Sequence, residues 1–385
     1  MTGPVRILLF TGPGGAGTTT VAAAAAVRSA RSGARTVLLS RQEPRVAGLD
    51  GVAGLSVVVV DPQRALEDLW RSRVEDLAGL LPQLDLPPAS SVVPLPGTGE
   101  LALLTELGRV EGDVVVVDAG PLERVAALLS LPATLRWWLD QALPPRLRAL
   151  GAVRTAALRA GAVRRGPLDA LLAAVPAVES LLDRVPLTDP GRTRVRLVTT
   201  AQRDGAGALR AAATTLGLFG QQPAAVLVRV LPSGDGDWWA RRAAEQEAAL
   251  AAAADIAEVV RVPELAGAAA EVADLAGLLP DGELPDPPAP APPAPERLDG
   301  GWRLVLPVPF AERGAVDLTR WADDLVVTAA GARRSVRLDP LLRRCEVTGG
   351  RLADPGTAAA RLEVTFVAVP ALWPAGLLAA EGGAT

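Results

Sequence analysis

A run of small residues near the amino terminus has the composition and the context of a phosphate-binding loop. Residues 11–20 read TGPGGAGTTT, follow the strand-like run Val5–Phe10 and precede an alanine-rich, helix-like stretch. Glycines let successive backbone N–H groups face one anion, and the dipole of a following helix favours negative charge. Gly12, Gly17 and Thr19 fall in register with the pattern G-x-x-x-x-G-K-[ST], so the segment predicts binding of nucleotide phosphates.

The loop lacks the cation that this pattern usually contains. Thr18 occupies the lysine position, and all 39 basic residues of the chain are arginines. The hydroxyl of Thr19 remains as an expected ligand for Mg²⁺. The residues that we expect to contact the phosphates or the metal are Gly12, Gly14, Gly15, Ala16, Gly17, Thr18, Thr19 and Thr20.

A carboxylate at the end of a later apolar run is the second candidate of this site. Asp118 closes the run Asp113–Asp118, and a carboxylate oxygen is a suitable Mg²⁺ ligand, directly or through water. The alternative is a strand-end aspartate that only caps the next turn. With Thr19, Asp118 predicts a site for Mg-ATP or Mg-ADP.

Composition narrows the classes of protein to which the chain can belong. It has 385 residues, no histidine and a formal net charge of −4, so histidine-based catalysis is excluded and nucleic acid is not expected as a partner. The single cysteine, Cys345, excludes an internal disulfide and a cysteine cluster for zinc. We find no signal peptide and no uninterrupted run of about 20 apolar residues, and therefore expect a cytoplasmic protein.

Apolar runs that alternate with Ala- and Leu-rich stretches must position these residues. Such runs predict βαβ units and a mainly parallel sheet flanked by helices, that is, an α/β fold. The six runs are Val5–Phe10, Thr36–Ser40, Ser56–Val60, Asp113–Asp118, Arg194–Thr199 and Ala224–Val230. A helical insert is expected over about residues 133–187, where Pro176 should bend or split a helix.

A proline-rich segment divides the chain. Residues 285–295 read PDPPAPAPPAP, which is typical of a stiff spacer. The closely spaced strand-like segments after it predict a small all-β sandwich; they are Trp302–Val308, Ala315–Leu318, Leu325–Thr328, Ser335–Leu338 and Leu362–Val367. We therefore expect an α/β nucleotide-binding domain over residues 1–283, a linker over 284–296, a sandwich over 297–370 and a tail over 371–385.

In the order of its motifs the chain resembles the ArsA-like ATPases, the family of arsenite-pump and tail-anchored-protein-targeting enzymes. Its loop is similar to the family's deviant Walker A sequence GKGGVGKTT, and residues 114–121 resemble the Walker B segment VVVDTAPTG. Further similarities are those of Glu43-Pro44 with Asp50 to DPAHSLSD, of residues 96–101 to PGxxEL, of residues 187–200 to LxDPxxTxxxLVT and of residues 228–232 to NRxLP. The segment Arg297–Val367 resembles the α-crystallin-type (small heat-shock) domain that ends some members.

The resemblance implies a fold, a dimer and roles for particular residues. The implied fold is that of P-loop NTPases. Asp50 would position the attacking water, Asp118 would hold Mg²⁺, and Arg229 with Pro232 would lie on the base side of the nucleotide. In the family, a loop lysine of one subunit reaches the nucleotide of the other.

Departures from the family pattern affect the expected chemistry. Pro13 and Thr18 stand where the family has its two loop lysines, and Ala119 and Val228 replace a switch threonine and a base-reading asparagine. Because phosphoryl transfer depends on electrostatic stabilisation, we expect a weak or inactive ATPase, a pseudo-ATPase that acts as a chaperone-like or regulatory subunit. The alternative is an active ATPase that drives anion export or handles membrane-protein clients, with its lysines replaced by Arg41, Arg45 or Arg124.

Two kinds of partner are expected. The resemblance implies a homodimer, or a heterodimer with a lysine-bearing ArsA-like paralogue. Within the insert, residues 136–165 contain seven arginines and one acid, Asp140, interleaved with leucine and tryptophan. This segment either forms a groove for an apolar protein segment or a contact with a membrane surface, or is a helical subdomain with a leucine core and solvated arginines.

Overall fold

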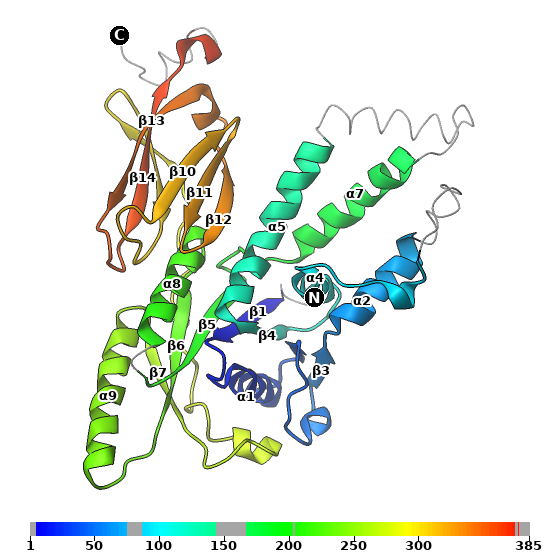
Figure 1. The fold of residues 1–385 in the computed structure, drawn as a ribbon, viewed down its shortest axis with the longest axis vertical. Helices are drawn as coiled ribbons and strands as arrows, with labels where there is room; N and C mark the ends of the chain where they lie inside the picture. Colours follow the sequence, from blue (N-terminus) through cyan, green and yellow to red (C-terminus); the bar gives the residue numbers. More distant parts are fainter. Residues whose placement is uncertain (1–4, 75–86, 144–166, 203–204, 374–375, 377–385) are drawn as a thin grey trace.

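A seven-stranded parallel sheet forms the centre of the larger part of the molecule (Figure 1). The computed structural model describes residues 5–74, 87–143, 167–202, 205–373 and 376. The strands are β1 (Arg6–Gly12), β2 (Thr36–Ser40), β3 (Leu55–Val59), β4 (Val114–Pro121), β5 (Thr193–Thr200), β6 (Pro223–Val230) and β7 (Val259–Pro263). They lie in the order β3-β2-β4-β1-β5-β6-β7. Runs of valine and leucine suit the inner strands, which are buried on both faces.

Helices cover both faces of the sheet. The longer ones are α1 (Thr18–Arg31), α2 (Pro62–Leu69), α4 (Thr98–Leu107), α5 (Leu122–Ala142), α7 (Pro167–Arg184), α8 (Gly205–Leu218) and α9 (Asp237–Ala254). Short helical turns are η1 (Leu49–Gly51), η2 (Trp70–Val74), η3 (Ala89–Ser91), η4 (Val272–Leu275), η5 (Leu342–Arg344) and η6 (Pro370–Leu372). Helix α1, with its buried alanines, and η4 pack on one face, whereas α4, α5, α7, α8 and α9 share the core of the other.

The α/β fold and all six predicted strands are confirmed. The sequence prediction missed β7, a five-residue edge strand whose residues alternate between buried and exposed. The predicted insert starts inside α5, which continues without interruption through Pro132, and α7 contains Pro176 without splitting there. Much of the arginine-rich segment falls within 144–166, outside the described residues. In the described ranges, every helix is too short or too polar to traverse a lipid bilayer.

The carboxyl-terminal part is a sandwich of two antiparallel sheets, as predicted. One sheet has the order β10-β11-β12 and the other β13-β14-β9-β8. Their strands are β8 (Pro295–Leu298), β9 (Gly301–Pro307), β10 (Val316–Trp321), β11 (Asp324–Ala329), β12 (Ala332–Arg337), β13 (Cys345–Ala353) and β14 (Arg361–Ala368). The prediction lacked β8 and β13. The predicted tail, 371–385, is described only at residues 371–373 and 376.

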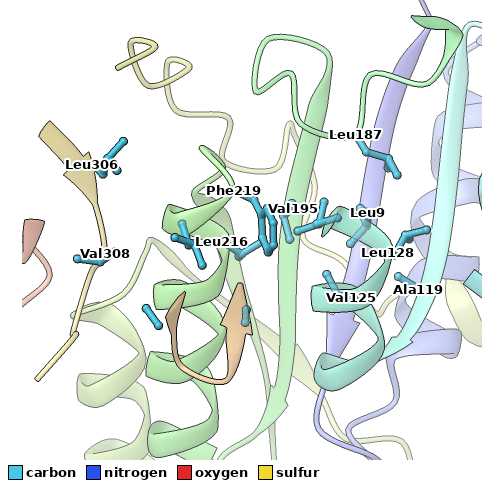
Figure 2. Packing of buried hydrophobic residues seen from close by; sticks show 14 of the residues in the cluster. Leu9, Ala119, Val125, Leu128, Leu187, Val195, Leu216, Phe219, Leu306 and Val308 are labelled. Carbon is cyan, nitrogen blue, oxygen red and sulfur yellow. The ribbon is translucent and has the colours of Figure 1, made fainter. Parts of the chain in front are cut away.

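The sandwich packs against α5 and α8 rather than standing apart from the parallel sheet (Figure 1). Figure 2 shows one apolar core that runs from Leu9 and Val195 in the parallel sheet, past Phe219 just after α8, to Leu306 on β9. The carbonyl oxygen of Pro309 accepts a hydrogen bond from Thr214 at 2.5 Å. The two parts of the chain therefore share a core.

The proline-rich linker is also attached to the sheet. Asp286 forms ion pairs with Arg6 and Arg194, and Gln222 donates a hydrogen bond to the carbonyl oxygen of Pro288 at 2.8 Å. The linker thus runs along the parallel sheet, close to the amino-terminal ends of β1, β5 and β6.

Candidate functional site

The glycine-rich loop follows the central strand of the sheet, where the direction of the chain reverses. From β1 the chain builds β2, β3 and β4 on one side, and then crosses to β5, β6 and β7 on the other. Ligands of open α/β sheets bind at such a switch point, outside the carboxyl ends of the strands. The predicted loop residues, 12–20, lie at this point between β1 and the first turn of α1.

Two glycines give the loop its shape. Gly15 and Gly17 have φ values of 81° and 87°, a region that disfavours other residues. At Gly12 the limit is space, because a Cβ atom there would lie 1.9 Å from the carbonyl oxygen of Val198. Gly14 and Gly15 are exposed. The loop can therefore receive a ligand from the solvent side.

In the described part of the chain, no side chain caps the amino terminus of α1. Its N-cap residue, Gly17, provides no side-chain hydrogen bond, and the first turn contains no acidic residue. The first N–H groups of a helix have no acceptor within the helix itself. Combined with the helix dipole, they form a suitable site for a phosphate group.

Asp118 is the centre of a small polar cluster beside the loop. Its carboxylate accepts hydrogen bonds from the Thr19 hydroxyl at 2.6 Å, from the Ser40 hydroxyl at 3.0 Å and from the Gly120 backbone N–H at 3.2 Å. The side chain is 4% exposed. The structure thus brings together the two residues, Thr19 and Asp118, that the sequence assigned to the metal, and a hydroxyl next to a carboxylate suits Mg²⁺.

Ser40 is a member of this cluster that the sequence analysis missed. It ends β2, is fully buried, and accepts a hydrogen bond from the backbone N–H of Gln42 at 3.1 Å. Because β2 and β4 are neighbours in register, Ser40 pairs with Asp118. The signal available in the sequence was a polar residue at the end of the apolar run Thr36–Ser40, just before the connection to the next strand.

The arginines near the site are already paired or exposed. Arg229, at the end of β6, forms a bidentate ion pair with Glu264 at 2.7 and 2.9 Å, and its Nη1 lies 3.4 Å from the Gly15 carbonyl oxygen. Arg41 pairs with Glu100 at 2.8 Å. The side chains of Arg45 and Arg124 are exposed. Arg229 is therefore the predicted residue that the structure places against the loop, although the sequence placed it beside the base.

The remaining predicted base-side and switch positions are apolar. Val228 is fully buried in β6, and Pro232 is exposed between β6 and α9. Ala119 is buried, and its following residue Gly120 accepts a hydrogen bond from Thr11 at 2.8 Å.

Asp50 does not lie at the loop. Its neighbours Gly48 and Gly51 line a surface hollow with Ala30 and Arg31, in the last turn of α1. Thr19 is in the first turn, about 16 Å away along the helix axis at 1.5 Å per residue. The structure therefore does not bring Asp50 together with Thr19 and Asp118, and its water-positioning role remains a prediction from the resemblance.

Metal-ligating side chains are sparse elsewhere. Within the described ranges, no three His, Cys, Asp or Glu side chains are grouped so that they could hold a metal ion. Cys345 is buried, and burial raises the pKa of its thiol to about 11.

Comparisons with known proteins agree with these features. The family model of the anion-transporting ATPase matches residues 5–278, and the model of the HSP20-like domain found in ArsA matches residues 299–366. An uncharacterized protein of Streptomyces coelicolor is 36% identical over 404 aligned residues, which cover 97% of this chain and all of that protein. A protein of Mycobacterium tuberculosis is 31% identical, over 96% of this chain and 97% of its own length.

A more distant similarity is to the arsenical pump-driving ATPase of Escherichia coli. It is 29% identical over 218 residues, 51% of this chain and 34% of that protein. The matched models cover the parallel sheet and the sandwich, and the first two relatives align over nearly the whole chain. The chain belongs to the ArsA ATPase family, and it ends in the HSP20-like domain that is found in ArsA proteins.

Proposed function

We propose that this chain is a nucleotide-binding member of the ArsA family that hydrolyses nucleotide feebly or not at all, and that it acts as a chaperone-like or regulatory subunit. One observation supports this most directly. The loop, Thr19 and Asp118 are arranged for Mg-nucleotide, while Thr18 and Pro13 stand in the positions of the two loop lysines.

The expected loss of rate follows from the missing charge. The transferred phosphoryl group is stabilised mainly by positioned charges. Removal of one preorganised stabilising group typically lowers kcat by about 10²–10³-fold. The chain contains no lysine that could move into the site. We expect Mg-nucleotide to bind through the backbone N–H groups, Thr19 and Asp118. These groups do not supply the charge that fast transfer of the phosphoryl group requires.

One observation favours the alternative, an active ATPase with arginine in place of lysine. The Arg229 guanidinium lies against the loop, 3.4 Å from Gly15. Against this, Glu264 neutralises Arg229 through two hydrogen bonds, and a third N–H of Arg229 is donated to the carbonyl oxygen of Gly15. Arg229 is therefore better suited to hold the loop in shape than to bind the transferred phosphoryl group.

The test is calorimetric titration of the purified chain with Mg-ATP and Mg-ADP, with turnover assayed on the same sample. We expect binding with little turnover. Thr18→Lys should raise turnover at least about tenfold over Thr18→Met, which has a similar length but no charge.

Two outcomes would contradict the proposal. Wild-type turnover of about 1 s⁻¹ or more, the range of ordinary enzymes, would show that the chain is an active ATPase. An absence of binding at millimolar nucleotide would show that the loop has the backbone shape of a phosphate-binding loop but does not bind nucleotide. If the wild type is an active ATPase, loss of turnover in Arg229→Met would show that Arg229 replaces the missing loop lysine.

We also propose that the subunit has a partner, either a second copy or a lysine-bearing paralogue. Pro13 replaces the lysine that reaches across the family dimer, so a paralogue could complete the site of this chain but would receive no lysine in return. Sedimentation of the chain with and without Mg-nucleotide tests the self-association.

Trp138, at the far end of α5, is 60% exposed, which supports a contact of this region with an apolar protein segment or a membrane surface.

A further inference from the structure

Four arginines gather near the amino-terminal edge of the parallel sheet, away from the nucleotide loop. Arg6 begins β1, Arg194 and Arg196 lie on β5, and Arg28 lies near the end of α1. Arg196 shares its face of the sheet with Phe10, to which it is paired in register, and Phe10 is buried beneath α1. We call these four residues, Arg6, Arg28, Arg194 and Arg196, the amino-edge cluster.

Arg196 is a buried cation without a hydrogen-bond partner for two of its nitrogens. The residue is 3% exposed, and its Nε and Nη1 atoms make no hydrogen bond among the described residues. Its guanidinium lies over the Phe10 ring, 5.8 Å from the ring centre. Unpaired buried charge is among the most costly features in a protein interior.

The neighbours of Arg196 add to this cost. Burial, and then repulsion by Arg6, Arg194 and Arg28, lowers the pKa of Arg196 to about 10. Asp286 acts on Arg196 in the opposite direction. The carboxylate of Asp286, however, forms its ion pairs with Arg6 and Arg194.

The amino-edge cluster leads from the surface into the interior. The side chain of Arg6 is 47% exposed, that of Arg194 is 16% exposed, and Arg196 is almost fully buried. Asp286 of the linker pairs with Arg6 and Arg194, at the outer end of this series. The linker carboxylate thus occupies the outer arginines and does not reach the inner one.

We propose that the amino-edge cluster binds a small tetrahedral oxyanion of the phosphate type, in competition with the carboxylate of Asp286. Arginine presents several N–H donors in a plane and binds phosphate oxygens in pairs. An oxyanion between Arg194 and Arg196 would satisfy the unpartnered nitrogens and neutralise the excess positive charge. Arg28 lies near the last turn of α1 and Arg194 near the start of β5, whereas the loop precedes the first turn of α1, so the proposal does not depend on nucleotide binding.

Binding of the anion would act on the linker. Arg28 donates a hydrogen bond to the carbonyl oxygen of Pro280 at 2.8 Å, and Gln222 holds Pro288, so the segment around Asp286 is fixed on both sides. An anion that takes over Arg194 would leave Asp286 with Arg6 as its remaining ion-pair partner, while these two attachments of the linker remain. The ligand would therefore loosen the middle of the linker without detaching it.

Thermal unfolding of the full chain tests the proposal. Sodium phosphate at about 10 mM, compared with sodium chloride at the same ionic strength, should raise the Tm of the wild type by about 2–4 °C. Arg196→Met should lose this response and, without phosphate, be at least as stable as the wild type, because it removes an unpaired buried charge. Arg109→Met is the matched control, because Arg109 is exposed and pairs only loosely with Glu106, at 3.6 Å.

The comparison between variants separates this site from the loop. Phosphate that binds only at the loop would stabilise the wild type, Arg196→Met and Arg109→Met equally, and this result would overturn the proposal. So would a wild type that responds to phosphate no more than to chloride. Glycerol phosphate serves as a second probe: an equal response extends the site to phosphate esters, and no response restricts it to the free anion.

A second variant decides the matter if Arg196→Met does not fold. Asp286→Asn removes the competing carboxylate and should lower the Kd for inorganic phosphate, measured by calorimetry, by about tenfold. An unchanged or higher Kd would contradict the competition between Asp286 and the anion.

Discussion

At the scale of single residues, the most informative group is the carboxylate of Asp118. Three segments that are far apart in the sequence, the start of α1, the end of β2 and the last residues of β4, each direct a donor at it. A carboxylate held in this way is in position before any ligand arrives, which is the arrangement that preorganised sites require. The position of this carboxylate is therefore fixed by the fold itself, independently of the two absent loop lysines.

A second carboxylate, Glu363, gives a prediction about acid stability. It is almost buried on β14 and lies 2.6 Å from Arg351, 3.1 Å from Arg361 and 4.0 Å from Arg303. The hydrogen bond from Arg351, together with the charges of the three arginines, lowers the pKa of Glu363. Its contribution to stability is therefore present above the unfolded-state pKa, about 4.3, and is lost as the pH falls through the folded-state value.

Glu363→Gln should lower the free energy of unfolding at pH 7 by about 1.5–3 kcal/mol, the range for hydrogen bonds to charged groups. The difference from the wild type should shrink below about pH 4, as measured by urea unfolding at several pH values. Glu346→Gln, at an exposed position of β13, is the control and should have little effect. A pH-independent difference would show that the arginines do not act through the charge of Glu363.

At the residue scale, the sequence could single out only those residues whose signal is local. The loop and Asp118 were identified because glycine spacing and a strand-end carboxylate can be read directly from the chain. Ser40 was missed because a serine at the end of a strand is common. Only the pairing of β2 with β4 brings its side chain to Asp118. Asp50 was inferred from resemblance, and the chain between β2 and β3 places it at the other end of α1.

At the scale of elements, strands with continuous apolar runs were predictable and irregular ones were not. β13 contains Gly349 and Gly350 and a register shift between Val347 and Gly349, so its alternation is broken. β8 begins at a proline and is mostly exposed. Tertiary pairing, rather than local pattern, makes these segments strands.

The contact between α8 and the sandwich gives a prediction at this scale. A Cβ atom on Gly217 would lie 2.4 Å from Cδ of Pro309 and 3.1 Å from the carbonyl oxygen of Pro307. Gly217→Ala should therefore destabilise the protein by about 1–3 kcal/mol through overpacking. Urea unfolding of the variant measures this loss.

The same helix contains its own control. Gly207 is exposed, and a Cβ atom there would meet no atom within 4 Å. Gly207→Ala should stabilise α8 by about 0.5–1 kcal/mol, because alanine loses less conformational freedom than glycine. If Gly217→Ala stabilised the protein as Gly207→Ala does, helix propensity would outweigh close packing at Gly217, and the overpacking prediction would be wrong.

At the scale of the whole molecule, the shared core determines how the protein unfolds. The apolar cluster that contains Val195 and Phe219 also contains Leu306, Val327 and Phe366 of the sandwich. The sequence predicted two domains joined by a stiff spacer, but it could not show this packing, because no local pattern in either part specifies its partner surface.

We therefore expect the two parts to unfold together. Scanning calorimetry should show one transition with equal calorimetric and van't Hoff enthalpies. Two resolved transitions, of which only the second responds to Gly217→Ala, would show that the sandwich is an independent unit. Fluorescence of variants that retain a single tryptophan, either Trp238 on α9 or Trp321 on β10, provides a check on each part separately.

The direct passage from β4 into α5 has a mechanical consequence. Asp118 lies four residues before the first residue of α5, with no intervening loop, and α5 contacts β12 of the sandwich. At its far end Asp140 acts electrostatically on Asp324 of β11. A helix of 21 residues is about 30 Å long, so a tilt of about 5° at its base moves its tip by about 3 Å. Helix α5 thus connects Asp118 directly with the HSP20-like domain, so that a change of tilt at the β4 end of the helix would be transmitted to β12.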